Sequence, residues 1–229
     1  MKRDMTLQYK SPEEIRAWQD DALRKAINYL AAKSPFYKRM FAENGIDPKS
    51  IKCVDDLKNI PVTTKDDLQK HNDDFLCVDK REIVDYVTTS GTMGNPVTFM
   101  LTESDLDRLA YNEHLSFDTA GCTADDVMQE MVTIDRRFMA GLAYFLGARE
   151  LGMGVARVGN GIPELQWDTI NRIRPTLCMC VPSFLMKIID FAEKNGINHH
   201  ASSLRKCVCI GEALRSPNGQ FSTLGQKIS

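Results

Sequence analysis

Short apolar runs alternate with longer helical patterns over most of this chain, and this alternation restricts its fold more than any other feature. The predicted strands cover 127–134, 155–158, 176–181 and 206–210, and the predicted helices between them cover 139–151, 163–173 and 184–195. Repeated strand–helix units of this length favour an α/β fold with a mainly parallel sheet and flanking helices. Ligands of such sheets bind beyond the carboxyl ends of the strands, which is where Pro182-Ser183 and Gly211-Glu212 fall.

A helical section precedes the strands. Ser11-Pro12-Glu13-Glu14 is a capping box with proline at the first helical position, so a helix begins there. A second helix runs from Pro35 to the stop signal Asn44-Gly45, and Thr64 caps a short helix over 65–70. We therefore expect a helical N-terminal section at residues 1–79 and an α/β subdomain at residues 80–229.

Residues 86–101 predict a strand, a polar loop and a second strand. The Ser90 and Thr92 hydroxyls, with the backbone N–H groups beside Gly91 and Gly94, can form a concave set of donors for an oligophosphate. The spacing excludes a Walker loop, because two residues separate the glycines where that motif needs four. No helix pattern starts inside the loop, so a Rossmann turn does not fit. A phosphate loop and a polar surface hairpin both remain open.

The charge balance gives no reason to expect binding to nucleic acid or to an anionic membrane. The chain carries 29 Lys and Arg against 31 Asp and Glu, for a net charge of −2. It contains no apolar run of signal-peptide length, and none approaches the roughly 18 residues of a membrane span. We expect a cytoplasmic protein.

Seven cysteines are an odd number, and we expect reduced thiols. Cys178 and Cys180, and again Cys207 and Cys209, lie two apart in predicted strands, which puts each pair on one face. If those strands were neighbours, four thiols could converge on zinc. Spacing within a strand splays side chains, however, unlike the loop-borne cysteines of structural zinc sites. We expect buried small apolar side chains and no metal.

Residues 88–96, Thr-Thr-Ser-Gly-Thr-Met-Gly-Asn-Pro, resemble the phosphate loop of the adenylate-forming acyl-CoA ligase superfamily, whose usual form is Ser/Thr-Ser-Gly-Thr-Thr-Gly-Lys-Pro. Four further segments, 34–37, 60–68, 181–183 and 211–215, are similar to signatures of its phenylacetate-CoA ligase group. The resemblance runs from about residue 34 to the last residue. It implies that the α/β part is an incomplete adenylate-forming large domain.

The resemblance implies a two-step reaction on an aryl carboxylic acid. The carboxylate attacks the α-phosphate of Mg-ATP to give an acyl adenylate and pyrophosphate, and the CoA thiol then displaces AMP. ATP, Mg²⁺ and CoA would be the cofactors, and the partners would be the aryl acid, CoA and, as the family suggests, a second copy of the chain in a homodimer.

The same resemblance assigns roles to particular residues, although it identifies no catalytic residue. Ser90, Gly91, Thr92 and Gly94 would hold the β- and γ-phosphates, and Gly211, Glu212 and Ala213 would lie along the adenine. The acyl pocket would contain Phe138, Ala140, Gly141, Tyr144 and Ser183, for which ordinary helix and strand core is the alternative interpretation.

Two loop residues depart from the family pattern. Met93 stands where the family usually has threonine, and Asn95 where lysine is common. Methionine cannot donate a hydrogen bond to a phosphate oxygen, so we expect weaker ATP binding. Members of the family also continue for about as many residues again, and residues 221–229 look like an interrupted helix. We therefore expect an N-terminal fragment that is inactive alone.

Two alternatives stay open. The first is a non-catalytic module, derived from the ligase fold, that binds a metabolite or a protein. The second is a structural fragment whose exposed sheet edge pairs with itself.

Overall fold

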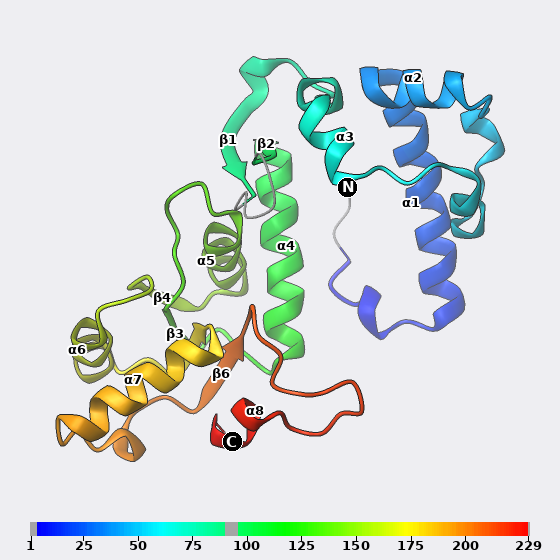
Figure 1. The fold of residues 1–229 in the computed structure, drawn as a ribbon. Helices are drawn as coiled ribbons and strands as arrows, with labels where there is room; N and C mark the ends of the chain where they lie inside the picture. The colour runs from blue at the N-terminus through cyan, green and yellow to red at the C-terminus, as the bar shows by residue number, and fades with distance from the viewer. Residues whose placement is uncertain (1–3, 90–95, 229) are drawn as a thin grey trace. The chain divides into compact units, whose positions relative to one another are not determined.

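The structure, a computed structural model, describes residues 4–89 and 96–228 and divides into two compact units, Met1–Glu103 and Ser104–Ser229 (Figure 1). The sequence predicted a change at residues 79 and 80, and the first strand indeed begins nearby, at Ile83. As a domain boundary, position 79/80 stays a prediction. None of the described helices is long and apolar enough to cross a membrane.

Helix caps define the first unit. Helix α1 (Pro12–Lys33) begins with the predicted capping box, in which Ser11 Oγ accepts from the Glu14 amide at 3.2 Å and Glu14 Oε2 accepts from the Ser11 amide at 3.0 Å. Helices α2 (Pro35–Glu43) and α3 (Lys65–Lys70) begin after the hydroxyl caps of Ser34 and Thr64. The predicted helix starts are therefore confirmed.

The first unit has its own small core and one strand pair. Phe36 of α2 stacks on Phe75, with ring centroids 4.2 Å apart. Strands β1 (Ile83–Thr88) and β2 (Thr98–Thr102) pair antiparallel, which confirms the two predicted strands, whereas the loop residues 90–95 lie outside the described residues. The core cluster contains Ile27, Phe36, Met40, Phe41 and Ile51. The short 3₁₀ helices of this unit are Leu7–Tyr9, Pro48–Ser50, Val54–Asn59, Asn72–Phe75 and Lys80–Glu82.

The second unit is built on a four-stranded parallel sheet with the order β4-β3-β5-β6. Its strands are β3 (Val127–Glu130), β4 (Gly154–Arg157), β5 (Leu177–Cys180) and β6 (Lys206–Cys209). Its helices are α4 (Glu103–Thr119), α5 (Met139–Leu151), α6 (Pro163–Ile173), α7 (Pro182–Lys194) and α8 (Thr223–Ile228), with a 3₁₀ helix at His199–Ala201. The predicted α/β class with a mainly parallel sheet is confirmed.

Two predicted bounds were wrong by two residues or more, and several others differ by one residue. The strand expected at 127–134 ends at Glu130, because the apolar residues after it are buried without being in a strand: Met131 and Val132 are 1% and 4% exposed. The helix expected at 184–195 begins at Pro182, because proline needs no amide partner in the first helical turn.

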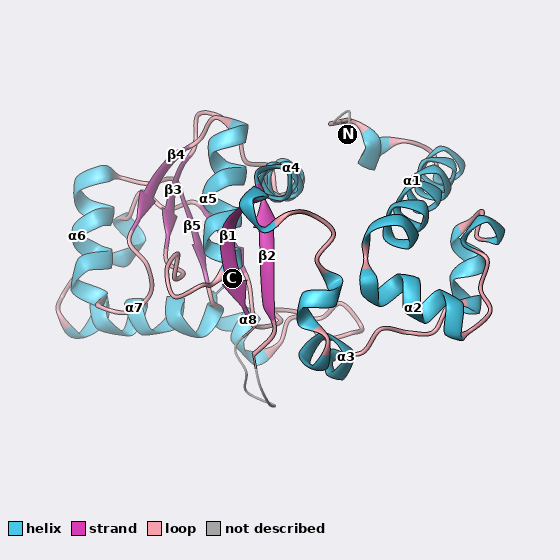
Figure 2. Cartoon of the chain, turned by 90° about the horizontal axis from the view of Figure 1, so that it is seen from above, coloured by secondary structure: helices cyan, strands magenta, loops and turns pink. Residues whose placement is uncertain are grey.

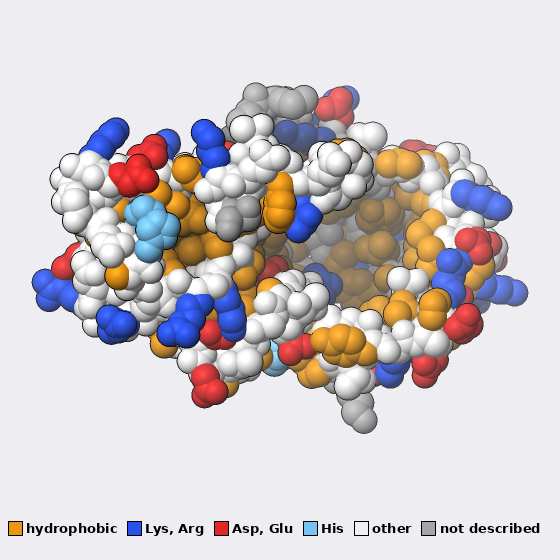
Figure 3. All heavy atoms as spheres, turned by 90° about the horizontal axis from the view of Figure 1, so that it is seen from below, with side chains coloured by type: hydrophobic (Ala, Val, Ile, Leu, Met, Phe, Trp, Pro, Cys, Tyr) orange, Lys and Arg blue, Asp and Glu red, His pale blue; other side chains and the backbone are white. Residues whose placement is uncertain are grey.

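Helices cover both faces of the sheet (Figure 2). On one face, Phe117 of α4 and Ala148 of α5 pack with the buried strand residues Met128, Leu177 and Met179. The opposite face carries α6 and α7, and its cluster contains Met131, Trp167, Ile170, Cys178, Cys180, Leu185, Ile188 and Ala192. Hydrophobic side chains of this unit also gather in a hollow on the left of the space-filling view (Figure 3).

Glycine at position 147 lets α5 approach α4 closely. A Cβ atom on Gly147 would lie 2.3 Å from Glu113 Cβ and 2.9 Å from the Glu113 carbonyl carbon. Contacts this short do not occur between real atoms, and one of them involves backbone. The two helices can therefore keep their spacing only with glycine there.

Glu130, at the end of β3, is fully buried, and within the described part of the chain neither of its carboxyl oxygens has a hydrogen-bond partner. Burial raises the pKa of Glu130 to about 7, although the charge of Arg157 on the adjacent strand β4 opposes the rise. The carboxyl group therefore keeps its proton in the folded state at pH values where an exposed glutamate is ionised.

We predict that Gly147→Ala destabilises the protein by about 2–3 kcal/mol, because the added methyl group must push α5 away from α4. Urea unfolding monitored by circular dichroism measures the change. Gly154→Ala is the matched control, since its Cβ would meet nothing closer than Val127 Cγ2 at 3.5 Å. Equal stability of the two variants would contradict the proposed close approach.

We predict that Glu130→Gln flattens the dependence of stability on pH. The native pKa of about 7 lies above the ordinary 4.5, so the native state binds the extra proton. The free energy of unfolding is therefore highest below pH 4.5. It falls by at most about 3 kcal/mol as the pH rises from 4.5 through 7. Glutamine cannot ionise, so the variant gains relative to the natural protein between pH 4.5 and 8. Urea unfolding at pH 4.5 and at pH 8 measures the difference. The control is Glu193→Gln, which changes an exposed glutamate. If the free energy of unfolding changes equally with pH in Glu130→Gln and in the natural protein, the prediction is wrong.

Candidate functional site

A pocket of about 640 Å³ lies at the carboxyl ends of the four parallel strands. This is where an open parallel sheet places its ligands, and the volume is typical of a small-molecule site. The lining residues, in the order of the strands they follow, are Met131, Val132, Thr133 and Phe138 after β3, Asn160, Gly161 and Pro163 after β4, Val181, Ser183, Phe184 and Lys187 after β5, and Ile210 after β6.

A hydrogen bond joins the segments that follow β5 and β6. The Ser183 amide, in the first turn of α7, donates to Glu212 Oε2 at 2.8 Å. A carboxylate is stabilised there, because the free amides and the dipole of a helix N-terminus favour negative charge. Gly211, just before Glu212, has φ +77°, a left-handed conformation that favours glycine. The contact thus fixes two segments that the sequence had singled out.

Two buried glutamines hold the wall that follows β4. Gln129 Nε2 of β3 donates to Gln166 Oε1 of α6 at 2.7 Å, and Gln166 Nε2 donates to the Gly159 carbonyl at 2.9 Å. Both glutamines are almost completely buried, and these bonds replace some of those that the amides would make to water, although Gln129 Oε1 has no hydrogen-bond partner among the described residues. They anchor the turn that carries Asn160 and Gly161 into the pocket.

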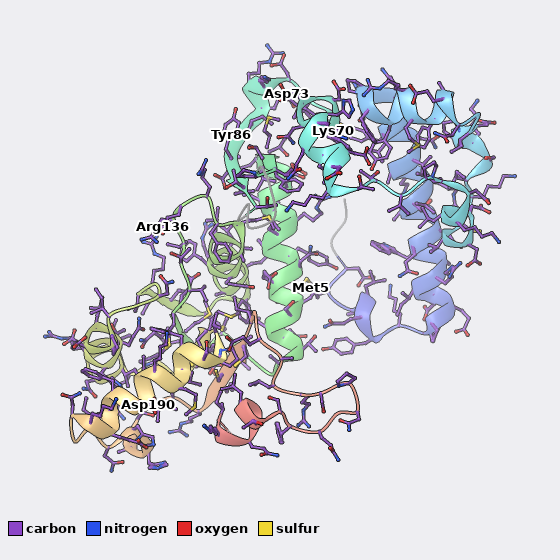
Figure 4. The ribbon with its side chains drawn as sticks, in the orientation of Figure 1. Met5, Lys70, Asp73, Tyr86, Arg136 and Asp190 are labelled. Atoms are coloured by element: carbon purple, nitrogen blue, oxygen red, sulfur yellow. The ribbon has the colours of Figure 1, made fainter. Side chains whose placement is uncertain are left out.

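The segment between β3 and α5 makes a tight turn beside the pocket. Arg136 and Arg137 both have left-handed backbone conformations, with φ values of 59° and 61°, which are uncommon for residues other than glycine. The Arg136 side chain points outward and is 81% exposed (Figure 4). Thr133 Oγ1 donates to Asp135 Oδ1 at 3.0 Å, and the Phe138 amide donates to the Asp135 carbonyl at 3.1 Å. The turn brings Thr133 and Phe138 to the same pocket.

The pocket is largely apolar, with a few polar groups. Thr133, Asn160 and Ser183 supply hydrogen-bonding side chains, and Lys187 of α7 supplies a positive charge. Such a surface can hold a partly apolar molecule that carries a polar or anionic group.

The five predicted acyl-pocket residues fall into two sets. Phe138 and Ser183 line the pocket. Ala140, Gly141 and Tyr144 lie on α5 instead. Gly141 packs directly against the wall, since a Cβ there would lie 2.0 Å from the Thr133 carbonyl oxygen. Tyr144 packs against the core, where burial, and then the charges of Glu113 and Glu130, raise its pKa. As ligand contacts, all five remain predictions.

The predicted nucleotide residues are placed in part. Gly211, Glu212 and Ala213 follow β6, and the Ala213 carbonyl accepts from Ser222 Oγ at 3.2 Å. Ser90, Gly91, Thr92 and Gly94, with Met93 and Asn95, lie outside the described residues. Sequence reasoning missed Thr133, Asn160, Gly161 and Lys187. Asn160 and Gly161 follow a predicted strand and could have been found by the same strand-end rule. Thr133 lay inside the strand predicted at 127–134, and Lys187 lies inside a helix, so neither gave a signal.

Comparisons with known proteins agree with this architecture. A family model described as "AMP-binding enzyme" matches residues 15–222. A phenylacetate-coenzyme A ligase of Thermus thermophilus is 32% identical over 201 residues, which are 87% of this chain and 45% of that protein. One of Pseudomonas putida is 30% identical over 196 residues, covering 85% of this chain and 44% of that protein. The chain thus spans less than half the length of these relatives.

Solved structures show the same fold. A 2-hydroxyisobutyryl-CoA ligase, in an open conformation in complex with 2-HIB-AMP and CoA, matches with a TM-score of 0.83 and 21% identity over 94% of this chain and 47% of that one. The same enzyme in its thioesterification state matches with a TM-score of 0.80 and 23% identity, over 88% of this chain and 44% of that one. The predicted resemblance to adenylate-forming ligases is confirmed. Because the family model matches most of the sequence, the chain belongs to the AMP-binding enzyme family.

Proposed function

We propose that this chain is part of a ligase that activates an aryl carboxylic acid with Mg-ATP to an acyl adenylate and then transfers the acyl group to CoA. The supporting observation is the pocket at the carboxyl ends of the strands, beside which the Ser183 amide binds Glu212, so that the segment proposed to contact the acyl group is joined to the segment proposed to contact the adenine. Relatives named phenylacetate-coenzyme A ligase support the aryl acid as substrate. Mg²⁺ and a cytoplasmic setting belong to the same proposal, as expected for an enzyme that uses ATP.

In the proposed adenylation reaction, the main role of the protein is to position the substrates. A carboxylate is a poor electrophile, and conversion to a mixed anhydride with AMP supplies a leaving group. Rate enhancement then comes from alignment of carboxylate and α-phosphate and from compensation of their negative charges. In this chain the apolar side chains of Phe138, Val181 and Phe184 would surround the aryl ring, and Lys187 would add positive charge at the wall.

A non-catalytic binding module is the second candidate, and Met93 is the observation that favours it. Methionine at a phosphate-contacting position removes a hydrogen-bond donor. A module that had lost ATP turnover could still hold an acyl group or an adenylate in the pocket. The two candidates differ in what they predict for ATP.

We predict that Phe138→Ala weakens binding of a non-hydrolysable phenylacetyl-adenylate analogue about 3- to 10-fold, because an aromatic contact contributes about 0.5–1.5 kcal/mol. Calorimetric titration of this chain measures it. Trp18→Ala is the matched control, since Trp18 of α1 has almost the same exposure, 39% against 40%, and lies outside the pocket lining. Equal affinities for the two variants would remove Phe138 from the acyl site.

We predict that Met93→Thr tightens Mg-ATP binding roughly 10- to 100-fold, because a hydrogen bond to a charged phosphate contributes about 1.5–3 kcal/mol. Met93→Leu, which restores no donor, should bind as the natural chain does. Calorimetry measures the affinities, and pyrophosphate release in the presence of phenylacetate reports activation. If Met93→Thr binds Mg-ATP no better, the phosphate role of this position is wrong; if no variant binds Mg-ATP, the binding-module candidate is favoured.

A further inference from the structure

Four cysteines lie together on one face of the sheet. Strands β5 and β6 are parallel neighbours, and their register sets Cys178 opposite Cys207 and Cys180 opposite Cys209. Directly opposed residues point to the same side of a sheet, as do residues two apart in one strand. All four thiols are free. The adjacency that the sequence left as a condition is therefore met.

The sulfur atoms are close to the spacing of metal ligands. Cys180 Sγ lies 3.4 Å from Cys207 Sγ, and Cys207 Sγ lies 3.3 Å from Cys209 Sγ. The sulfurs of Cys178, Cys180 and Cys207 all lie within 4.8 Å of one another. Tetrahedral zinc with bonds of about 2.3 Å holds its sulfur ligands about 3.8 Å apart. Small side-chain rotations would thus bring these three onto one ion.

Two cysteines of one strand are too splayed to bind zinc by themselves, but here the ligands come from two neighbouring strands. Cys178 and Cys180 alone would splay, but Cys207 on β6 lies close to both and can complete a triangle above the sheet. Cys209 contacts Cys207 but does not belong to the group whose sulfurs all converge. The geometry therefore favours three protein ligands.

The cysteines of the cluster differ in their exposure to solvent, so an ion would reach them from one side. Cys178 and Cys180 are 1% and 0% exposed, within the cluster that contains Trp167 and Ile188. Cys207 is exposed and lies on β6, which is at the end of the strand order. An ion could enter past Cys207 and be held against the apolar layer.

We propose that Cys178, Cys180 and Cys207 bind one Zn²⁺ ion per chain, with the fourth coordination position open to water or an external ligand. Zinc accepts thiolate ligands in tetrahedral geometry and takes no part in redox chemistry. Binding displaces the thiol protons into solvent and joins β6 to β5. This inference is independent of the adenylation chemistry and of the pocket.

The test is metal titration of this chain, reduced with a phosphine that does not bind metals. Co²⁺ should bind with a stoichiometry of one and give the intense visible bands and near-ultraviolet charge-transfer band of tetrahedral cobalt thiolate. Zn²⁺ should then displace it. Competition with a chromophoric chelator gives the Zn²⁺ affinity. Binding without the thiolate charge-transfer band, or no binding, would overturn the proposal.

The variants separate a metal site from ordinary apolar core. Cys207→Ser, at the exposed ligand, should weaken Zn²⁺ binding by more than about 100-fold, since changes outside the ligand shell already cost 10- to 100-fold. Cys180→Ala, which keeps a small apolar side chain in the core, should have the same effect and provides a second variant if the first does not fold. Cys122→Ala, in the cluster on the opposite face, is the matched control and should bind as the natural chain does.

Cys209→Ser tests the size of the ligand set. A less than 10-fold change supports three thiolates, whereas a loss as large as that of Cys207→Ser would overturn the three-ligand assignment. Mass spectrometry of the purified protein tests the competing chemistry. A disulfide between Cys207 and another of these cysteines, together with no metal binding after reduction, would overturn the site.

Discussion

Burial on both faces of β5, one of the two interior strands, is the constraint on which the second unit depends. All four of its residues are buried, with Leu177 and Met179 against one helical layer and Cys178 and Cys180 against the other. A strand without a solvent-facing side requires helices on both faces, and parallel neighbours require crossover connections that supply them. The same arrangement sends every strand end to one edge of the sheet. The burial of β5 therefore also determines at which edge of the sheet the pocket lies.

Two polar side chains inside this core, Gln129 and Glu130, differ in whether they have hydrogen-bond partners. Gln129 and Glu130 are adjacent in β3, so their side chains face opposite layers. Gln129 finds Gln166 and becomes part of the scaffold that holds the turn at Gly159. Glu130 has no hydrogen-bond partner in the described part of the chain, and its burial favours the protonated form in the folded state. One strand thus contributes both an anchor for the pocket and a pH-sensitive group behind it.

Local signals in the sequence were sufficient where one residue decides a boundary. The capping box that begins at Ser11 and the cap at Thr64 mark helix starts that the structure confirms. The predicted strand 127–134 is too long because the apolar residues after Glu130 are also buried. Burial alone does not distinguish a strand from a buried loop. The left-handed conformations of Arg136 and Arg137 could not be predicted, since arginine has no preference for a positive φ. Lys187 reaches the pocket only because of how α7 is oriented.

Strand β6 connects the thiol cluster to the pocket. Cys207 and Cys209 lie on it, Ile210 then lines the pocket, and Glu212 accepts from the amide of Ser183. Because β6 has a single neighbour in the described sheet, its position depends on the ladder to β5. An ion bound by Cys178, Cys180 and Cys207 would cross-link this ladder immediately before the segments that meet at the site. The position of the Glu212 carboxylate would then depend on the same two strands that hold the metal.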